Sequence, residues 1–74
     1  MDKYYVNPPC NCDVCSAPIT TEFSDALLPR FGQWANVCPT CAVVRGVTYG
    51  TGRGQRYRRV ETKAGKLAYL KVEG

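Results

Sequence analysis

Cysteine is the residue of this chain with the clearest chemistry, and four of the five cysteines form two pairs of equal spacing. Two residues separate Cys12 from Cys15 and Cys38 from Cys41, and 22 residues lie between the pairs. Two residues between cysteines allow both sulfurs to reach one ion at about 2.3 Å. Two such pairs complete a tetrahedral site, so the spacing predicts one structural Zn²⁺ bound by Cys12, Cys15, Cys38 and Cys41.

Other uses of the cysteines stay open on the sequence alone. A rubredoxin-like iron site would use four thiolates in the same tetrahedral geometry. A disulfide-bonded, metal-free chain fits less well, because five cysteines is an odd number and the first residues do not resemble a secretion signal. Cys10 is either a free thiol or a replacement for Cys12, and the two-residue spacing favours Cys12 as the ligand.

The remaining residues do not indicate catalysis. The chain contains no histidine, and its N-terminal carboxylates have no convincing partner group for acid–base chemistry. A metal held by four thiolates has no open position for a reactive water. We therefore expect a protein that is not an enzyme and takes no small-molecule substrate.

The length of the chain explains why a metal is needed. A chain of 74 residues is long enough for one domain, but so small a core rarely offsets the conformational entropy lost on folding. The longest apolar runs have three residues, far fewer than a membrane span requires. We expect a single domain in the cytoplasm, where thiols stay reduced.

Charge divides the chain into two unlike parts. Residues 1–44 carry two basic and four acidic side chains, a net charge of −2, whereas residues 45–74 carry eight basic and two acidic side chains, a net charge of +6. The basic half predicts an acidic or polyanionic partner.

The pattern of apolar and turn residues predicts a small α+β domain stapled by zinc. We expect an extended arm over residues 1–9, a zinc-binding core over 10–47, a glycine-rich loop over 48–56 and a basic β-hairpin over 57–74. Within the core, the pattern predicts strands over 19–23 and 33–37, with a turn that begins at Ser24 and Asp25. The hairpin is expected to pair 57–62 with 67–72, placing Ala68, Leu70 and Val72 on one face opposite Val60.

The second cysteine pair is expected to open a short helix over 39–45. Pro39 suits the first helical position, and Gly46 suits the left-handed position after the last turn. Both cysteines would then lie at a helix N-terminus, which stabilises thiolates. Knuckle, hairpin and helix in this order form a treble clef; a zinc ribbon, with both pairs on hairpin turns, is the alternative. Trp34 is expected to pack beside the zinc site, against Phe23 or the helix.

Several short motifs together resemble small zinc-finger proteins encoded by tailed bacteriophages. They are Cys-Asp-Val-Cys at 12–15, Phe-x-Asp at 23–25, Gly-Gln-Trp-Ala-Asn-Val-Cys-x-x-Cys at 32–41 and Gly-Thr-Gly-x-Gly-Gln-x-Tyr at 50–57. The resemblance covers most of the chain. It implies zinc on the four paired cysteines, a treble-clef-like core and life in the cytoplasm of an infected bacterium. Ser16 departs from the pattern, because glycine often follows the second cysteine of a knuckle.

The basic half carries the candidate nucleic-acid-binding residues. Arginines neutralise phosphates, and aromatic rings stack on bases. The candidates are Arg53, Arg56, Arg58, Arg59, Tyr57 and Lys66, with Tyr49 beside them. Strand alternation puts Arg58 and Arg59 on opposite faces, so they cannot share one flat patch. The glycine-rich loop matches no nucleotide fingerprint, and it serves either phosphate approach or only the connection between elements.

Two functions follow, and the sequence leaves both open. The first is a module that binds nucleic acid through its basic C-terminal half, and the second is an interaction factor that binds and modulates a host bacterial protein. A hairpin whose charges only keep it soluble is the plainest alternative to both.

Overall fold

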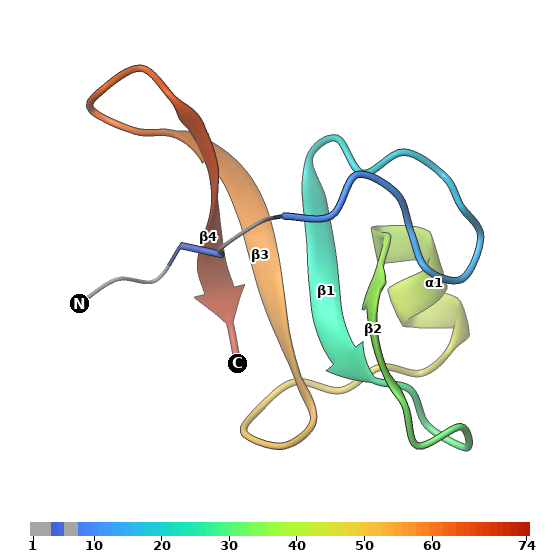
Figure 1. The fold of residues 1–74 in the computed structure, drawn as a ribbon. Helices are drawn as coiled ribbons and strands as arrows, with labels where there is room; N and C mark the ends of the chain where they lie inside the picture. The colour runs from blue at the N-terminus through green and yellow to red at the C-terminus, as the bar shows by residue number, and fades with distance from the viewer. Residues whose placement is uncertain (1–3, 6–7) are drawn as a thin grey trace.

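The computed structural model describes residues 4–5 and 8–74, and it contains one four-stranded antiparallel sheet with one short helix (Figure 1). The strands are β1 (Glu22–Leu27), β2 (Trp34–Val37), β3 (Gly54–Glu61) and β4 (Leu67–Glu73), and the helix is α1 (Pro39–Val44). The strand order across the sheet is β2-β1-β3-β4. The predicted α+β class and the C-terminal hairpin are confirmed. Residues 1–3 and 6–7 of the expected arm lie outside the described residues.

The first strand begins later than the sequence predicts. The Ile19 backbone N–H donates a hydrogen bond of 2.9 Å to the Cys10 carbonyl, so the start of the predicted strand over 19–23 still belongs to the cysteine-rich turn. Ser24 and Asp25, expected to begin a turn, lie inside β1 and pair with β2 on one side and β3 on the other. That prediction was wrong because β1 is a central strand, where pairing on both edges overrides the turn preference of these residues.

The C-terminal hairpin is longer than predicted and is part of the main sheet. β3 begins at Gly54 instead of residue 57, because the backbone from there to Arg58 pairs with β1. Gly54 is buried, and a Cβ on it would lie 2.8 Å from the Thr48 carbonyl oxygen and 3.0 Å from the Ala26 Cβ. Close backbone approach therefore requires glycine here, while Gly52, with φ of 78°, supplies the turn that precedes the strand.

Two apolar clusters lie on the two faces of the sheet. One contains Phe23, Tyr69 and Ile19, with Tyr5 and Tyr57 packed against it. The other gathers the buried cysteines Cys12, Cys38 and Cys41 with Leu28, Val37 and Ala42. The hairpin register pairs Val60 with Ala68, so Ala68, Leu70 and Val72 share one face opposite Val60, as predicted. Tyr69, on the opposite face, is buried beside Phe23, whereas Val72 is 40% exposed.

The helix matches its prediction closely. α1 begins at Pro39 and ends at Val44, and Arg45 caps it. Gly46 has φ of 72°, and the Val47 N–H reaches back to the Ala42 carbonyl at 2.9 Å, which closes the helix end. A helix of six residues is too short to be stable alone, so its position depends on packing and on the cysteines at its start.

Part of the N-terminal arm docks on the sheet. The Tyr5 N–H donates to the Tyr69 carbonyl at 2.9 Å, and the Tyr5 ring packs edge-on against Phe23 and Tyr57. Tyr4 makes an isolated bridge to Leu70 and is 44% exposed. Within the described part of the chain, no helix has the length and apolar character that crossing a membrane requires.

Candidate metal centre

Four cysteine sulfurs converge between the knuckle at residues 12–15 and the start of α1. The Sγ atoms of Cys12, Cys15, Cys38 and Cys41 all lie within 4.8 Å of one another, and those of Cys15 and Cys38 are 3.7 Å apart. A tetrahedron with zinc–sulfur bonds of about 2.3 Å has sulfur–sulfur edges of about 3.8 Å. The cluster thus has the size and the donor set to hold one metal ion.

Cys10 is not part of this cluster. Its side chain is exposed, and its backbone carbonyl accepts the hydrogen bond from the Ile19 N–H at the start of the knuckle. Cys12, by contrast, is only 3% exposed, and its Sγ lies within 4.8 Å of the other three sulfurs. The geometry therefore selects Cys12 over Cys10, as the two-residue spacing predicts.

The knuckle is closed by its own backbone. The Ser16 N–H donates to the Cys12 carbonyl at 2.9 Å, and the Cys12 N–H donates to the Ala17 carbonyl at 2.8 Å. The Val14 N–H points at the Cys12 Sγ at 3.4 Å. Ser16 has φ of 65°, the left-handed conformation that makes glycine common at this position of a knuckle.

Replacing Ser16 by glycine is therefore expected to stabilise the folded protein. The Ser16 side chain is exposed, so the substitution removes the backbone strain without loss of packing. We expect the free energy of unfolding to rise by about 1 kcal/mol, measured by chemical denaturation of the metal-loaded protein. A matched Ala17→Gly variant, at a position without positive φ, should not be stabilised; equal effects of the two substitutions would contradict this account of Ser16.

The second cysteine pair is held by the helix start. Cys38 is the N-cap residue of α1, with φ of −71° and ψ of 165°, and its Sγ accepts a hydrogen bond from the Cys41 N–H at 3.5 Å. Pro39 occupies the first helical position, where a backbone N–H would have no partner within the helix, so the missing N–H of proline costs no hydrogen bond. The second pair thus opens a helix and does not lie on a hairpin turn, so the zinc-ribbon alternative does not describe this structure.

The pKa values of two thiols in the cluster, Cys12 and Cys41, are shifted in opposite directions. Burial alone raises a thiol pKa, but at Cys12 the backbone N–H groups of Cys15, Cys38 and Val14 outweigh burial and lower the pKa to about 6. At Cys41, burial and the neighbouring sulfurs raise the pKa to about 12. One ionised sulfur thus opposes ionisation of the next. A bound metal cation would relieve this repulsion.

Asp13 ties the knuckle to the sheet, a role the sequence did not reveal. Its carboxylate accepts a hydrogen bond of 2.8 Å from the Asn36 N–H, and its own N–H donates to the Asn36 carbonyl at 2.8 Å. Asn36 lies on β2, the edge strand that leads into Cys38. The two halves of the cysteine cluster are therefore joined through backbone as well as through sulfur.

Trp34 does not pack beside the cluster, contrary to expectation. It is 50% exposed at the first position of β2, whereas Val37 is fully buried among the cysteines with Ala35 beside it. Side chains alternate along a strand, so when Ala35 and Val37 face the cysteines, Trp34 faces the other way. Phe23 belongs to the second cluster, with Tyr5, Tyr57 and Tyr69.

Two of the proposed nucleic-acid-binding residues are engaged in internal contacts. Arg56 pairs with Glu22 at 3.3 Å and with Glu73 at 3.0 Å. The Tyr57 ring stacks on Phe23 with a centroid distance of 5.3 Å. Tyr49, which we placed beside this group, forms a hydrogen bond of 2.8 Å between its hydroxyl and that of buried Ser24.

The other four proposed residues are exposed but not brought together. Arg58 and Arg59 are neighbours on β3 and point to opposite faces, as alternation predicts. Lys66 lies in the β3–β4 turn, where its N–H donates to the Thr62 hydroxyl at 3.2 Å. Arg53 ends the glycine-rich loop, and its guanidinium lies against Gly50. The candidates thus occupy separate places on the molecule.

Comparison with known proteins adds no assignment to this geometry. No family model, no curated protein and no solved structure matches the chain significantly.

Proposed function

We propose that the chain is a non-catalytic binding module whose fold is held by one zinc ion on Cys12, Cys15, Cys38 and Cys41, in a treble-clef arrangement. The supporting observation is the cluster of four sulfurs within 4.8 Å, three of them on buried residues. The order of elements also supports it, since a knuckle, the β1–β2 hairpin and α1 follow one another along the chain. A metal on four thiolates stabilises a fold and leaves no position for a substrate.

The donor set favours zinc among the metals of a cell, although iron accepts the same geometry. Cobalt substitution tests the site itself: Co²⁺ held by four thiolates absorbs strongly in the visible range, and Zn²⁺ should abolish this colour by displacing it. A chain that gives no thiolate–cobalt absorption, or that keeps it in excess Zn²⁺, contradicts the proposal. Protein purified with a red iron colour would assign the site to iron instead.

We further propose that the exposed basic residues of the C-terminal half bind nucleic acid. The support is their charge and exposure: in the described part of the chain, both ion pairs involve Arg56, so Arg53, Arg58 and Arg59 are available for phosphates. Their separation on the surface favours contact with a flexible single strand that follows several faces. The protein would bind this nucleic acid inside an infected bacterial cell, as the resemblance to bacteriophage proteins implies.

Replacing Arg53, Arg58 and Arg59 together by glutamine is expected to weaken binding of a labelled single-stranded DNA and flatten its salt dependence. Three lost phosphate contacts reduce the slope of log K against log salt concentration by about 2. Fluorescence anisotropy at several salt concentrations measures both effects. An Arg30→Asn/Arg45→Gln variant, with charge removed elsewhere, is the control. Binding that is absent in the parent protein, or insensitive to salt, would end this proposal.

A further inference from the structure

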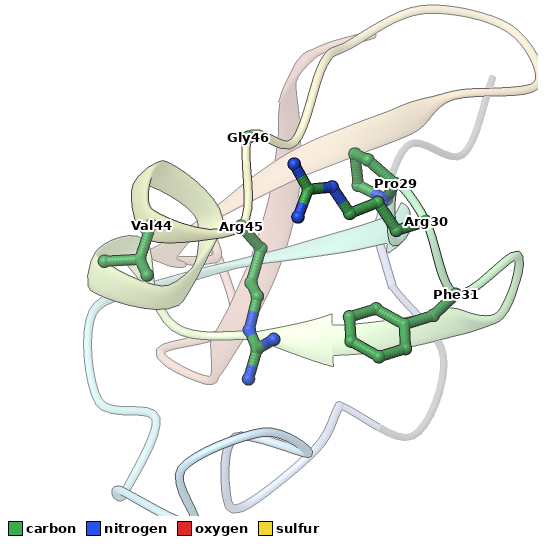
Figure 2. A pocket seen from close by; sticks show the side chains of 6 residues that line it. All are labelled: Pro29, Arg30, Phe31, Val44, Arg45 and Gly46. Atoms are coloured by element: carbon green, nitrogen blue, oxygen red, sulfur yellow. The ribbon is translucent and has the colours of Figure 1, made fainter.

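A hollow of about 330 Å³ lies where the end of α1 meets the turn after β1, away from the cysteine cluster. It is lined by Pro29, Arg30, Phe31, Val44, Arg45 and Gly46. Figure 2 shows the side chains of Arg30, Phe31 and Arg45 surrounding the space between the helix end and this turn. The volume is at the lower end of the range typical of ligand pockets, about 300–1,000 Å³.

The hollow is basic and lacks a balancing acid. Both of the ion pairs among residues 4–5 and 8–74 involve Arg56, so neither Arg30 nor Arg45 is neutralised by a carboxylate there. The segments that supply the walls, residues 29–31 and 44–46, contain two arginines and no aspartate or glutamate. Two uncompensated guanidinium groups beside one hollow favour an anionic ligand, which arginine can bind with two parallel hydrogen bonds.

The backbone at Arg30 is strained for a residue with a side chain. Its φ of 74° is left-handed, and Gly32, two residues later, has φ of 66°. A non-glycine residue in this region costs about 1 kcal/mol or more relative to glycine. A turn that served only to connect β1 and β2 would be more stable with glycine or asparagine at Arg30. An arginine is nevertheless present at this position, and its side chain lines the hollow.

Two apolar side chains that line the hollow are unusually exposed. Phe31 is 59% exposed and Val44 is 75% exposed. The Arg45 guanidinium already lies 5.4 Å from the centre of the Phe31 ring, so that aromatic face is not free to stack on a base. Exposed aliphatic side chains beside arginine and an aromatic ring are typical of protein interfaces.

We propose that this hollow, with Val44 of α1 in its wall, docks an acidic segment of another protein. One carboxylate of the partner binds between Arg30 and Arg45, and a neighbouring leucine or phenylalanine covers Val44 and Phe31. Charge complementarity identifies the partner's chemistry, since the hollow has two cations and no acid. None of the arginines proposed above for nucleic acid, Arg53, Arg58 and Arg59, lines this hollow.

The test is an NMR titration of the zinc-loaded, ¹⁵N-labelled protein, whose spectrum first shows that the chain is folded. The probe is the peptide acetyl-Glu-Leu-Asp-Leu-Phe-amide. We expect shifts confined to the amides of residues 30–31 and 44–46 and to the Arg30 and Arg45 side-chain Nε–H groups. Arg30→Asn, which keeps a residue tolerant of positive φ, and Arg45→Gln should each weaken binding about tenfold.

Three controls decide the outcome. Lys63→Gln removes the same charge at an exposed position in the turn between β3 and β4 and should leave affinity unchanged. The Arg30→Gly variant should no longer bind the peptide, yet it should unfold at a denaturant concentration equal to or higher than that of the parent protein. If Arg30 had only a structural role, loss of binding would be accompanied by loss of stability. The amide analogue acetyl-Gln-Leu-Asn-Leu-Phe-amide should bind at least about tenfold more weakly.

Other results would overturn the proposal. Equal binding of both peptides would show that charge is not used. Shifts of the same amides by a thymidine octanucleotide in place of the peptide would assign the hollow to nucleic acid. Shifts that depend on protein concentration alone would assign it to a second copy of this chain.

Discussion

Replacing Cys41 by serine is expected to leave the chain unfolded at room temperature, even in the presence of zinc. A structural zinc site contributes about 10–16 kcal/mol to the folding of small zinc-binding peptides. A domain of this size has a total stability of about 4–11 kcal/mol at typical values per residue. Losing a buried ligand at the start of α1 removes more than the remaining core supplies. Circular dichroism and the dispersion of amide NMR signals measure the loss.

Cys10→Ser is the matched control for this prediction. It makes the same chemical change at an exposed cysteine outside the cluster. The variant should bind one metal ion and unfold at the denaturant concentration of the parent. If Cys10→Ser destabilised the protein as much as Cys41→Ser does, the assignment of the four ligands would be wrong.

Replacing Phe23 by alanine is expected to have the largest effect of any substitution outside the metal site. Phe23 is fully buried, and its ring contacts Tyr5, Tyr57 and Tyr69 with centroid distances of 5.0, 5.3 and 5.1 Å. Truncation of a buried phenylalanine costs about 3–5 kcal/mol. For a domain of this length, the thermal transition should fall by more than about 10 °C. Thermal unfolding of the zinc-loaded protein, followed by circular dichroism, checks this.

Phe31→Ala provides the comparison, because Phe31 is 59% exposed. The same truncation there should change the free energy of unfolding by less than about 0.5 kcal/mol. It should nevertheless weaken binding of the acidic peptide, since Phe31 is a wall of the hollow. A Phe23→Ala protein as stable as the parent would show that the tyrosine cluster contributes little to folding.

The cysteine cluster and the helix could be predicted because their signals are local. Two residues between cysteines bring both sulfurs of a pair together over a single turn, whatever the rest of the chain does. Pro39 and Gly46 mark the ends of α1 through their own backbone preferences, and the structure places the helix end within one residue of the prediction. Only the meeting of the two pairs depends on tertiary structure.

The sheet was predicted less well because its pattern depends on distant partners. Ser24 and Asp25 have the composition of a turn, yet they lie on a strand paired on both edges. Nothing in the local sequence indicates that β1 and β3 are neighbours. The burial of Tyr69 could not be predicted for the same reason: Tyr69 is covered by Phe23 and by Tyr5, neither of which is close to it in sequence.

The binding surfaces show the same limit. Composition marks the second half as basic, but it cannot show that Arg56 is neutralised by Glu22 and Glu73 from two different strands. Nor can it show that Arg30 and Arg45, 15 positions apart, line one hollow. The one local sequence feature at that hollow is the run Arg30-Phe31-Gly32 in a turn. Such a run is too common to identify a binding site.

Metal content and chelator response, measured together on the purified, reduced protein, test the central claim most directly. Native mass spectrometry should find one zinc ion per chain, and removal of that ion by a strong chelator should abolish the cooperative thermal transition, which added Zn²⁺ should restore. A protein that carries no metal, unfolds cooperatively and is unaffected by the chelator would contradict the account.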